Sequence, residues 1–226
     1  MIRVDDLRKG YGGRPVLRGL QLRFERGSVY GLVGENGAGK TTLFRCLAGL
    51  ESYTGSIHSE LNPLKDHLGF LPTDPPLLSY LTGREYLRFV CQARGVQPER
   101  LDERNVFELP LDQYAVNYST GMKKKLALLG VLFQQNEVFI LDEPFNGVDI
   151  QSNLLISEII SALRDLGKTV LLSSHIFDTL RPVCDEIGLL REGQITESVK
   201  RGDFDRIEAE MRRVSIRGAV DRLGLS

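Results

Sequence analysis

The sequence lacks any apolar run of about 18 residues, the shortest length that usually spans a membrane as a helix. Its first residues, from Met1 to Asp5, lack the basic and then apolar order of a secretory signal peptide. Internal repeats and low-complexity tracts are also missing. We therefore expect a protein that is soluble or that a partner holds at a membrane.

A strong charge of either sign is missing as well. Lys and Arg number 29, Asp and Glu number 30, and the formal net charge is −1. This balance gives no overall attraction to nucleic acid or to anionic lipid, so we expect no nucleic-acid partner. With 226 residues, the chain is long enough to bury a proper core.

Cysteine is scarce. The three cysteines, Cys46, Cys91 and Cys184, are far apart in the sequence. Their odd number and their spacing predict neither a disulfide framework nor a metal cluster, which favours a reducing compartment. Each lies among apolar neighbours, so we expect three small core residues.

The sequence does contain a complete phosphate-binding loop. An apolar segment of strand length precedes it at 28–33, and a helical pattern closed by a glycine follows at 43–49. Glycines let successive N–H groups point at one oxyanion, and the helix adds its positive end. The side chains add a cation for the β- and γ-phosphates from Lys40 and a Mg²⁺ ligand from Thr41. The loop, which predicts nucleotide binding, consists of Gly34, Glu35, Asn36, Gly37, Ala38, Gly39, Lys40, Thr41 and Thr42.

A second candidate segment is the apolar run at 138–141, which is typical of a strand buried on both faces of a parallel sheet. It ends in Asp142 and Glu143, and two adjacent carboxylates are costly there unless something positive meets them. In nucleotide hydrolases an acid at this place holds Mg²⁺ and its neighbour polarises water. The alternative is a solvated loop that carries two acids.

A histidine follows the next buried strand, predicted at 169–173. His175 thereby leaves the sheet at the same end as Asp142 and the phosphate loop. Ligands bind at that edge of an open parallel sheet, which favours a nucleotide-facing role over a structural one.

The remaining pattern predicts strands at 2–4 and 20–24, a turn at 54–55, a strand at 68–71 and a hairpin at 186–196. Between 73 and 118 we expect a mainly helical insert. Its first helix begins at Thr82 with a capping box to Glu85 and presents Tyr86, Phe89, Val90 and Ala93 on one face. A weaker helical piece is expected after residue 105.

Another helix is predicted from residue 119, and its first turn carries Lys123, Lys124 and Lys125. Cations near a helix N-terminus oppose the helix dipole. Either they form an ordinary solvated face, or this end of the helix faces an anion.

Tyr11 is an aromatic residue between glycines. Its ring either covers the edge of a small sheet or stays open to stack on a base.

Together these features resemble the ATP-binding subunits of ABC transporters over about residues 1–200. The matching motifs, in the order of the family, are the adenine-stacking Tyr11, the Walker A loop at 34–42, the family signature at 118–122, the Walker B strand with Asp142 and the catalytic Glu143, the D-loop at 146–149 and the switch histidine His175. The insert looks most like that of the export-type subgroup.

The chain departs from the family pattern at a few positions. The signature has Thr120 in place of glycine and Met122 in place of glutamine, and the D-loop is also unusual. By alignment, Thr73 takes the place of the glutamine that usually reaches Mg²⁺ and the attacking water. Its hydroxyl could act through a bridging water, or hydrolysis could be slow, or coupling to a partner could be altered.

The resemblance implies an α/β fold: a P-loop NTPase core with a mainly parallel sheet, an N-terminal antiparallel β subdomain and a helical insert. It implies one domain over 1–226, with a catalytic core at 1–72 and 134–200, a helical subdomain at 73–133 that includes the signature helix, and a tail at 201–226. The tail is charged and is predicted to be partly helical.

The resemblance also implies an ATPase that uses Mg²⁺ and works as a head-to-tail dimer, with an identical or a different second subunit. Lys40 and Thr41 would hold triphosphate and metal, Asp142 would bind Mg²⁺ through water, Glu143 would deprotonate the attacking water, and His175 would contact the γ-phosphate. The signature residues of the second subunit, Ser119, Thr120 and Gly121, would complete each site, and the lysine-rich helix start would face the partner's ATP.

A transporter subunit without a membrane span needs an integral membrane permease, so we expect peripheral attachment at the cytoplasmic face of the membrane. Residues 72–76 and the helical insert would receive that permease. Two alternatives stay open: a soluble ABC-type ATPase that is not part of a transporter, and a module that gates a partner with little hydrolysis.

Overall fold

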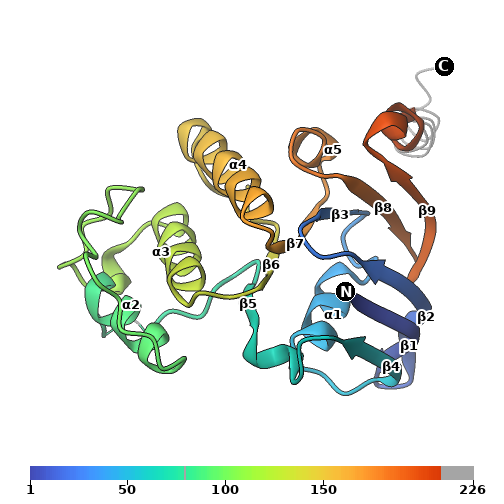
Figure 1. Ribbon diagram of the computed structural model, residues 1–226, viewed down its shortest axis with the longest axis horizontal. Coiled ribbons are helices and arrows are strands. Elements are labelled where there is room, and N and C mark those ends of the chain that lie inside the picture. Colours follow the sequence, from blue (N-terminus) through green and yellow to red (C-terminus); the bar gives the residue numbers. More distant parts are fainter. Residues whose placement is uncertain (79, 210–226) are drawn as a thin grey trace, which may run out of the picture.

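Two β-sheets with helices around them make up the structure, a computed structural model that describes residues 1–78 and 80–209 (Figure 1). The larger sheet has six strands in the order β5-β6-β7-β3-β8-β9. Its strands are β3 (Val29–Val33), β5 (Leu68–Leu71), β6 (Val138–Asp142), β7 (Thr169–Ser174), β8 (Glu186–Arg191) and β9 (Gln194–Lys200). Only β9 runs antiparallel, as the second arm of the predicted hairpin. The expected mainly parallel sheet is confirmed.

Both faces of this sheet are buried, because a hydrophobic core lies on each side of it. In β6, Phe139 and Leu141 belong to one core, while Val138 and Ile140 belong to the other. This alternation explains why the strand is apolar at every position before Asp142.

The smaller sheet is antiparallel, in the order β2-β1-β4, and consists of β1 (Ile2–Tyr11), β2 (Arg14–Phe24) and β4 (Thr54–Ser59). The turn predicted at 54–55 is wrong, because these residues begin β4. Gly55 has φ +94°, and a Cβ there would lie 2.3 Å from the carbonyl oxygen of Asp6. The glycine therefore permits a close approach to β1 and does not reverse the chain.

Helices lie on both faces of the larger sheet. Helix α1 (Lys40–Leu47) packs between the two sheets, while α4 (Ile150–Asp165) and α5 (Phe177–Leu180) pack on the opposite face (Figure 1). Short 3₁₀ turns occur at Leu64–Asp66, Ala115–Asn117 and Arg201–Asp203. In the part of the chain that the structure describes, no helix is both long and apolar enough to cross a membrane.

The insert expected at 73–118 is not mainly helical, because its described residues contain only α2 (Gly83–Gln92) and the 3₁₀ turn at Ala115–Asn117 as helical elements. Helix α2 packs against α3 (Thr120–Phe133) at one end of the molecule (Figure 1). The Thr82–Glu85 capping box is confirmed. The predicted inner face of α2 is only half right, because Phe89 is 54% exposed and Leu87 and Cys91 are buried instead. The weaker helical piece expected after residue 105 is reduced to the 3₁₀ turn at Ala115–Asn117, because residues 106–114 form turns and irregular chain.

The remaining predictions concern the three cysteines and the C-terminal tail. All three cysteines are buried and free, as expected. Residues 204–209 are helical, with Phe204 and Ile207 in the core next to α5. The rest of the predicted tail, 210–226, lies outside the described residues.

Candidate active site

The strand order brings the predicted site residues to one edge of the larger sheet. Strand β7 lies between β6 and β3, and the register pairs Asp142 with Ser173 and Val33 with Ser174. The phosphate loop, Asp142 and His175 therefore leave the carboxyl ends of three adjacent strands. They meet at a cavity of about 560 Å³ that is lined by Val16, Asn36, Gly37, Gly39, Lys40, Thr41, Thr42, Thr73, Asp142, Glu143, Asn146 and His175.

The loop needs glycine for two separate reasons. A Cβ on Gly34 would lie 2.3 Å from the carbonyl oxygen of Leu190, so the close approach to β8 excludes a side chain. Gly39 caps α1 with φ +112°, in the left-handed region. No side chain caps the N–H groups of the first turn of α1, which leaves them free for an anion.

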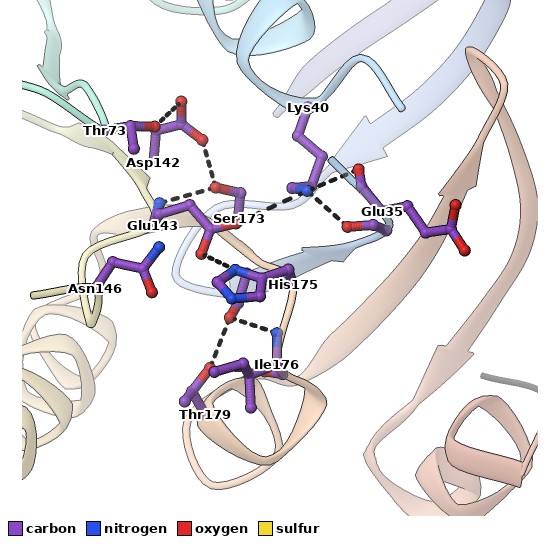
Figure 2. Close-up of polar contacts among 12 residues, drawn as sticks. Glu35, Lys40, Thr73, Asp142, Glu143, Asn146, Ser173, His175, Ile176 and Thr179 are labelled. Atoms are coloured by element: carbon purple, nitrogen blue, oxygen red, sulfur yellow. Dashed lines mark hydrogen bonds and ion pairs between the residues drawn. The ribbon is translucent and has the colours of Figure 1, made fainter. Parts of the chain in front are cut away.

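The buried ammonium of Lys40 is turned back onto this loop. Its Nζ donates to the carbonyl oxygens of Gly34 at 2.6 Å and Glu35 at 3.2 Å, and it lies 3.7 Å from Oε1 of Glu143 (Figure 2). The side chain of Glu35 points away from the site, so this residue contributes its carbonyl group (Figure 2). A buried lysine held mainly by neutral carbonyls is well placed to exchange them for phosphate oxygens.

The carboxylate of Asp142 is fully buried, at 0% exposed. Its Oδ2 accepts hydrogen bonds from Thr41 Oγ1 at 2.6 Å and from Thr73 Oγ1 at 2.9 Å, and Ser173 donates to Oδ1. Hydroxyl groups alone do not neutralise a buried carboxylate. A hard cation such as Mg²⁺ prefers this set of oxygen ligands, so the residues fit such an ion.

Glu143 lies between the two basic side chains of the site. Its Oε2 is 3.0 Å from Nδ1 of His175, and its Oε1 faces Lys40 (Figure 2). Its backbone is left-handed, with φ +52°, which is uncommon for a residue with a side chain. The Glu143 N–H donates to Ser173 Oγ at 2.9 Å.

Two residues of this site, Ser173 and Val16, were missed by the reasoning from sequence, and Asn146 was named only as part of the D-loop at 146–149. Ser173 bridges the acidic pair by bonding both the Asp142 carboxylate and the Glu143 N–H, while Asn146 and Val16 line the cavity. A hydroxyl at the end of an otherwise apolar strand was the available signal for Ser173. Val16 carries no chemical signal in the sequence.

Tyr11 is not among the residues that line the cavity. This residue is 44% exposed, at the end of β1, and the Lys9 ammonium lies 4.9 Å from the centroid of its ring. An open ring is compatible with stacking on a base, but the structure of this chain alone does not bring the ring to the phosphate site.

The signature residues also lie away from the cavity, at the start of α3. The Ser119 side chain caps this helix by accepting a bond from the Met122 N–H at 3.2 Å. A Cβ on Gly121 would lie 2.7 Å from the Gly147 carbonyl oxygen, so the helix start packs closely on the turn at 146–149. Ser119 and Thr120 are exposed.

Two of the three lysines that follow turn inward. Lys124 donates to the carbonyl oxygens of Glu143 and Asn146, and Lys125 donates to Asp149 Oδ2 and Ser152 Oγ. Groups of the same chain thus hold both ammonium groups, one of them through the Asp149 carboxylate, and the facing of this helix start to a partner's ATP stays a prediction.

Comparisons with known proteins agree with this geometry. A family model described as "ABC transporter" matches residues 17–146. The lantibiotic transport ATP-binding protein SrtF of Streptococcus pyogenes is 32% identical over 207 residues, covering 86% of this chain and 89% of SrtF. The bacitracin transport ATP-binding protein BcrA of Enterococcus faecalis is 34% identical over 215 residues, covering 88% of this chain and 69% of BcrA.

Solved structures match as well. A structure described as the ATP-binding subunit of an ABC transporter superposes with a TM-score of 0.82 at 27% identity and covers 99% of both chains. A dimeric ATP-binding cassette with bound ADP and Pi superposes with a TM-score of 0.80 at 19% identity, which supports the fold alone.

The fold and the site define a P-loop nucleotide-binding domain with a buried acidic pair opposite the loop. The chain belongs to the ABC transporter family, and it is an ATP-binding subunit with the ATPase activity of that family.

Proposed function

We propose that this chain binds ATP with Mg²⁺ at the cavity beside α1, and that a head-to-tail dimer hydrolyses ATP to drive an export-type transporter. One observation carries the proposal. The Glu143 carboxylate lies between Lys40 and His175, directly beside the buried Asp142. This is the placement that a general base needs next to a phosphate and metal site.

The residues divide the work as follows. Lys40 leaves the carbonyls of Gly34 and Glu35 and binds the β- and γ-phosphates, together with the N–H groups of the first turn of α1. Thr41, Asp142 and Thr73 would hold Mg²⁺. Bound Mg²⁺ supplies positive charge against the charge that develops on the phosphates.

The proton transfer falls to Glu143. Its carboxylate accepts the proton of the attacking water, and His175 fixes the orientation of that carboxylate and contacts the γ-phosphate. The proposal gives Tyr11 contact with the adenine, and Val16 adds apolar surface at the cavity.

A second subunit completes the site. Support comes from Ser119 and Thr120, which are exposed at the start of α3 and do not line the cavity of their own chain. The proposal assigns Ser119, Thr120 and Gly121 to the ATP of the second subunit.

The membrane partner is proposed to dock on the helical insert. A groove of about 610 Å³ runs between residues 70–76, α2 and α3, where Tyr86 and Val90 line one wall. An integral permease would bind in this groove and hold the chain at the cytoplasmic face of the membrane. The chain would divide into a catalytic core at 1–72 and 134–200, a helical part at 73–133 and a tail at 201–226. Relatives named for lantibiotic and bacitracin transport favour export over a role outside transport.

Replacement of Glu143 by Gln tests the proposal. Loss of the general base should lower kcat by about 10²–10⁴-fold and should leave ATP bound. The variant should then form a dimer in MgATP, as measured by sedimentation velocity. Glu192→Gln, in the exposed β8–β9 turn, is the matched control and should behave as the wild type. A Glu143→Gln protein that hydrolyses ATP normally and stays monomeric in saturating MgATP would contradict the proposal.

A second candidate function is an ATP-gated module with little hydrolysis. The observation that favours it is the hydrogen bond from Thr73 to Asp142, which ties this side chain to the acidic pair and leaves no amide group to reach the attacking water. Steady-state hydrolysis by Thr73→Gln separates the two candidates.

A further inference from the structure

Lys124, on α3, is a buried charged residue that the proposed mechanism does not use. It is 4% exposed. Its Nζ donates to the carbonyl oxygens of Glu143 at 2.7 Å and Asn146 at 3.1 Å. Burial lowers the pKa of this ammonium, while the carboxylates of Asp74, Glu143 and Asp142 act in the opposite direction. Burying a lysine here costs free energy unless its ammonium group is hydrogen-bonded to the surrounding structure.

The carbonyl that Lys124 binds belongs to the residue with the unusual backbone. Glu143 has φ +52°, a region that residues with a side chain rarely adopt and that persists only where surrounding groups hold it. Its N–H is held by Ser173 Oγ. Its carbonyl oxygen is held by Lys124 and, at 3.2 Å, by the Asn146 N–H.

This backbone decides where the Glu143 side chain points. The carboxylate is directed at His175 and Lys40, which leave adjacent strand ends (Figure 2). Lys124 reaches the same residue from α3, which begins within the signature and packs on the turn at 146–149. One side chain thus ties the signature helix to the backbone of the acidic pair.

We propose that Lys124 is a positioning residue for ATP hydrolysis, which holds the left-handed backbone of Glu143 through the carbonyls of Glu143 and Asn146 and so aims the Glu143 carboxylate. The inference rests on the proposed role of Glu143. Lys124 does not touch the reacting atoms. Its two bonds are charge-assisted, the one to Glu143 is buried and the one to Asn146 is partly buried, so their loss leaves two carbonyl groups without that donor.

The test compares Lys124→Met with Lys124→Gln in the full chain. Both replacements remove the charge and keep a long side chain, but only Gln keeps N–H donors for the carbonyl groups. For Lys124→Met we expect kcat to fall by about 10- to 100-fold, because a small displacement of a catalytic group has effects of that size. We expect ATP Kd to change by less than about twofold in both variants, and kcat of Lys124→Gln to stay within about threefold of wild type.

A second measurement does not depend on hydrolysis. In the nucleotide-free protein, amide hydrogen exchange at 143–146 should be faster in Lys124→Met than in Lys124→Gln or wild type, because the Asn146 N–H bonds the same carbonyl as Lys124. Circular dichroism and thermal melting verify that each variant is folded.

The outcomes separate this inference from the proposed function. Normal hydrolysis by Glu143→Gln overturns the role of Glu143 and the inference with it. If Glu143→Gln is inactive but the Met and Gln variants at 124 have equal kcat and equal exchange at 143–146, the inference alone is overturned. If Lys124→Met unfolds, the comparison of Lys124→Gln with Lys124→Leu in the exchange measurement decides in the same way.

Discussion

Helices α1 and α3 begin in opposite ways, although each has a buried lysine near its start. Helix α1 follows Gly39, which offers no side chain to cap it, while α3 follows Ser119, whose hydroxyl bonds the Met122 N–H. Lys40 folds back onto carbonyls of its own loop, whereas Lys124 reaches across to the carbonyls of Glu143 and Asn146.

The difference shows which helix start is prepared for a ligand. The first-turn N–H groups of α1 have no cap, and the Lys40 ammonium has only carbonyl groups of its own loop as partners. All of these donors have full hydrogen-bond partners only when an anion binds. A capped helix whose lysine is bonded to a distant segment is already satisfied by the protein. The start of α1 is therefore less stable than a capped helix start, but it can bind an anion. The start of α3 instead connects the signature helix to the backbone of the acidic pair.

The largest effect should come from a substitution at the start of α1. Lys40→Met removes two or more charge-assisted bonds to phosphate, each of about 1.5–3 kcal/mol, so ATP Kd should rise by about 10²–10⁴-fold. Calorimetric titration with MgATP measures it. Lys168→Met, which removes a lysine paired with Glu137 at the protein surface, should leave Kd unchanged. A Kd for Lys40→Met within threefold of wild type would contradict the role given to the α1 start.

A smaller effect should follow at Thr73, which shares Asp142 Oδ2 with Thr41 of α1. Thr73→Val keeps the shape and removes the hydroxyl, so the affinity for Mg²⁺ in the presence of ATP should fall by about tenfold. Thr73→Ser retains the hydroxyl and is the matched control.

The same position separates the two candidate functions. If Thr73 limits turnover, Thr73→Gln should raise steady-state kcat by about tenfold. If the Thr73 hydroxyl serves an active enzyme, kcat of Thr73→Gln should stay level or fall. Equal Mg²⁺ affinity in Thr73→Val and Thr73→Ser would show that the hydroxyl is unimportant for the metal.

The smallest effect should come from the α3 start. Ser119→Ala removes the N-cap and should lower the free energy of unfolding by about 1 kcal/mol, as measured by urea denaturation. Ser119→Asn retains a cap and should keep the stability of wild type. Both variants should bind ATP as monomers with unchanged Kd. A stability of Ser119→Ala equal to that of Ser119→Asn would mean that the cap does not stabilise α3.

Local patterns were sufficient to predict a large part of the fold. The apolar runs of β6 and β7, the capping box at Thr82 and the hairpin of β8 and β9 depend on neighbouring residues only, and all three are confirmed. The positions of the phosphate loop, Asp142 and His175 at one sheet edge followed from the rule for parallel strands, and the register confirms this shared edge.

The failed predictions depend on contacts between distant segments. The buried face of α2 is decided by its tertiary contacts: Tyr86 and Val90 lie against Gly130 of α3, Leu87 and Cys91 are buried in the core, and Phe89 stays exposed. Gly55 looked like a turn residue because its close contact with β1 cannot be read from its neighbours. The inward direction of Lys124 depends on the Glu143 and Asn146 carbonyls, which lie 19 and 22 residues further along the chain.

The three thiols are shielded from reagents. Burial raises the pKa of the Cys46 thiol to about 11, and it raises the pKa of Cys91 and Cys184 as well. Alkylating reagents attack the thiolate, so they should pass over all three sites in the folded protein at neutral pH. A cysteine introduced at Ile150, which is 80% exposed, would then take a spin label selectively. The natural sequence is thus already suited to measuring, by dipolar spectroscopy, how far apart two copies stand before and after ATP is added.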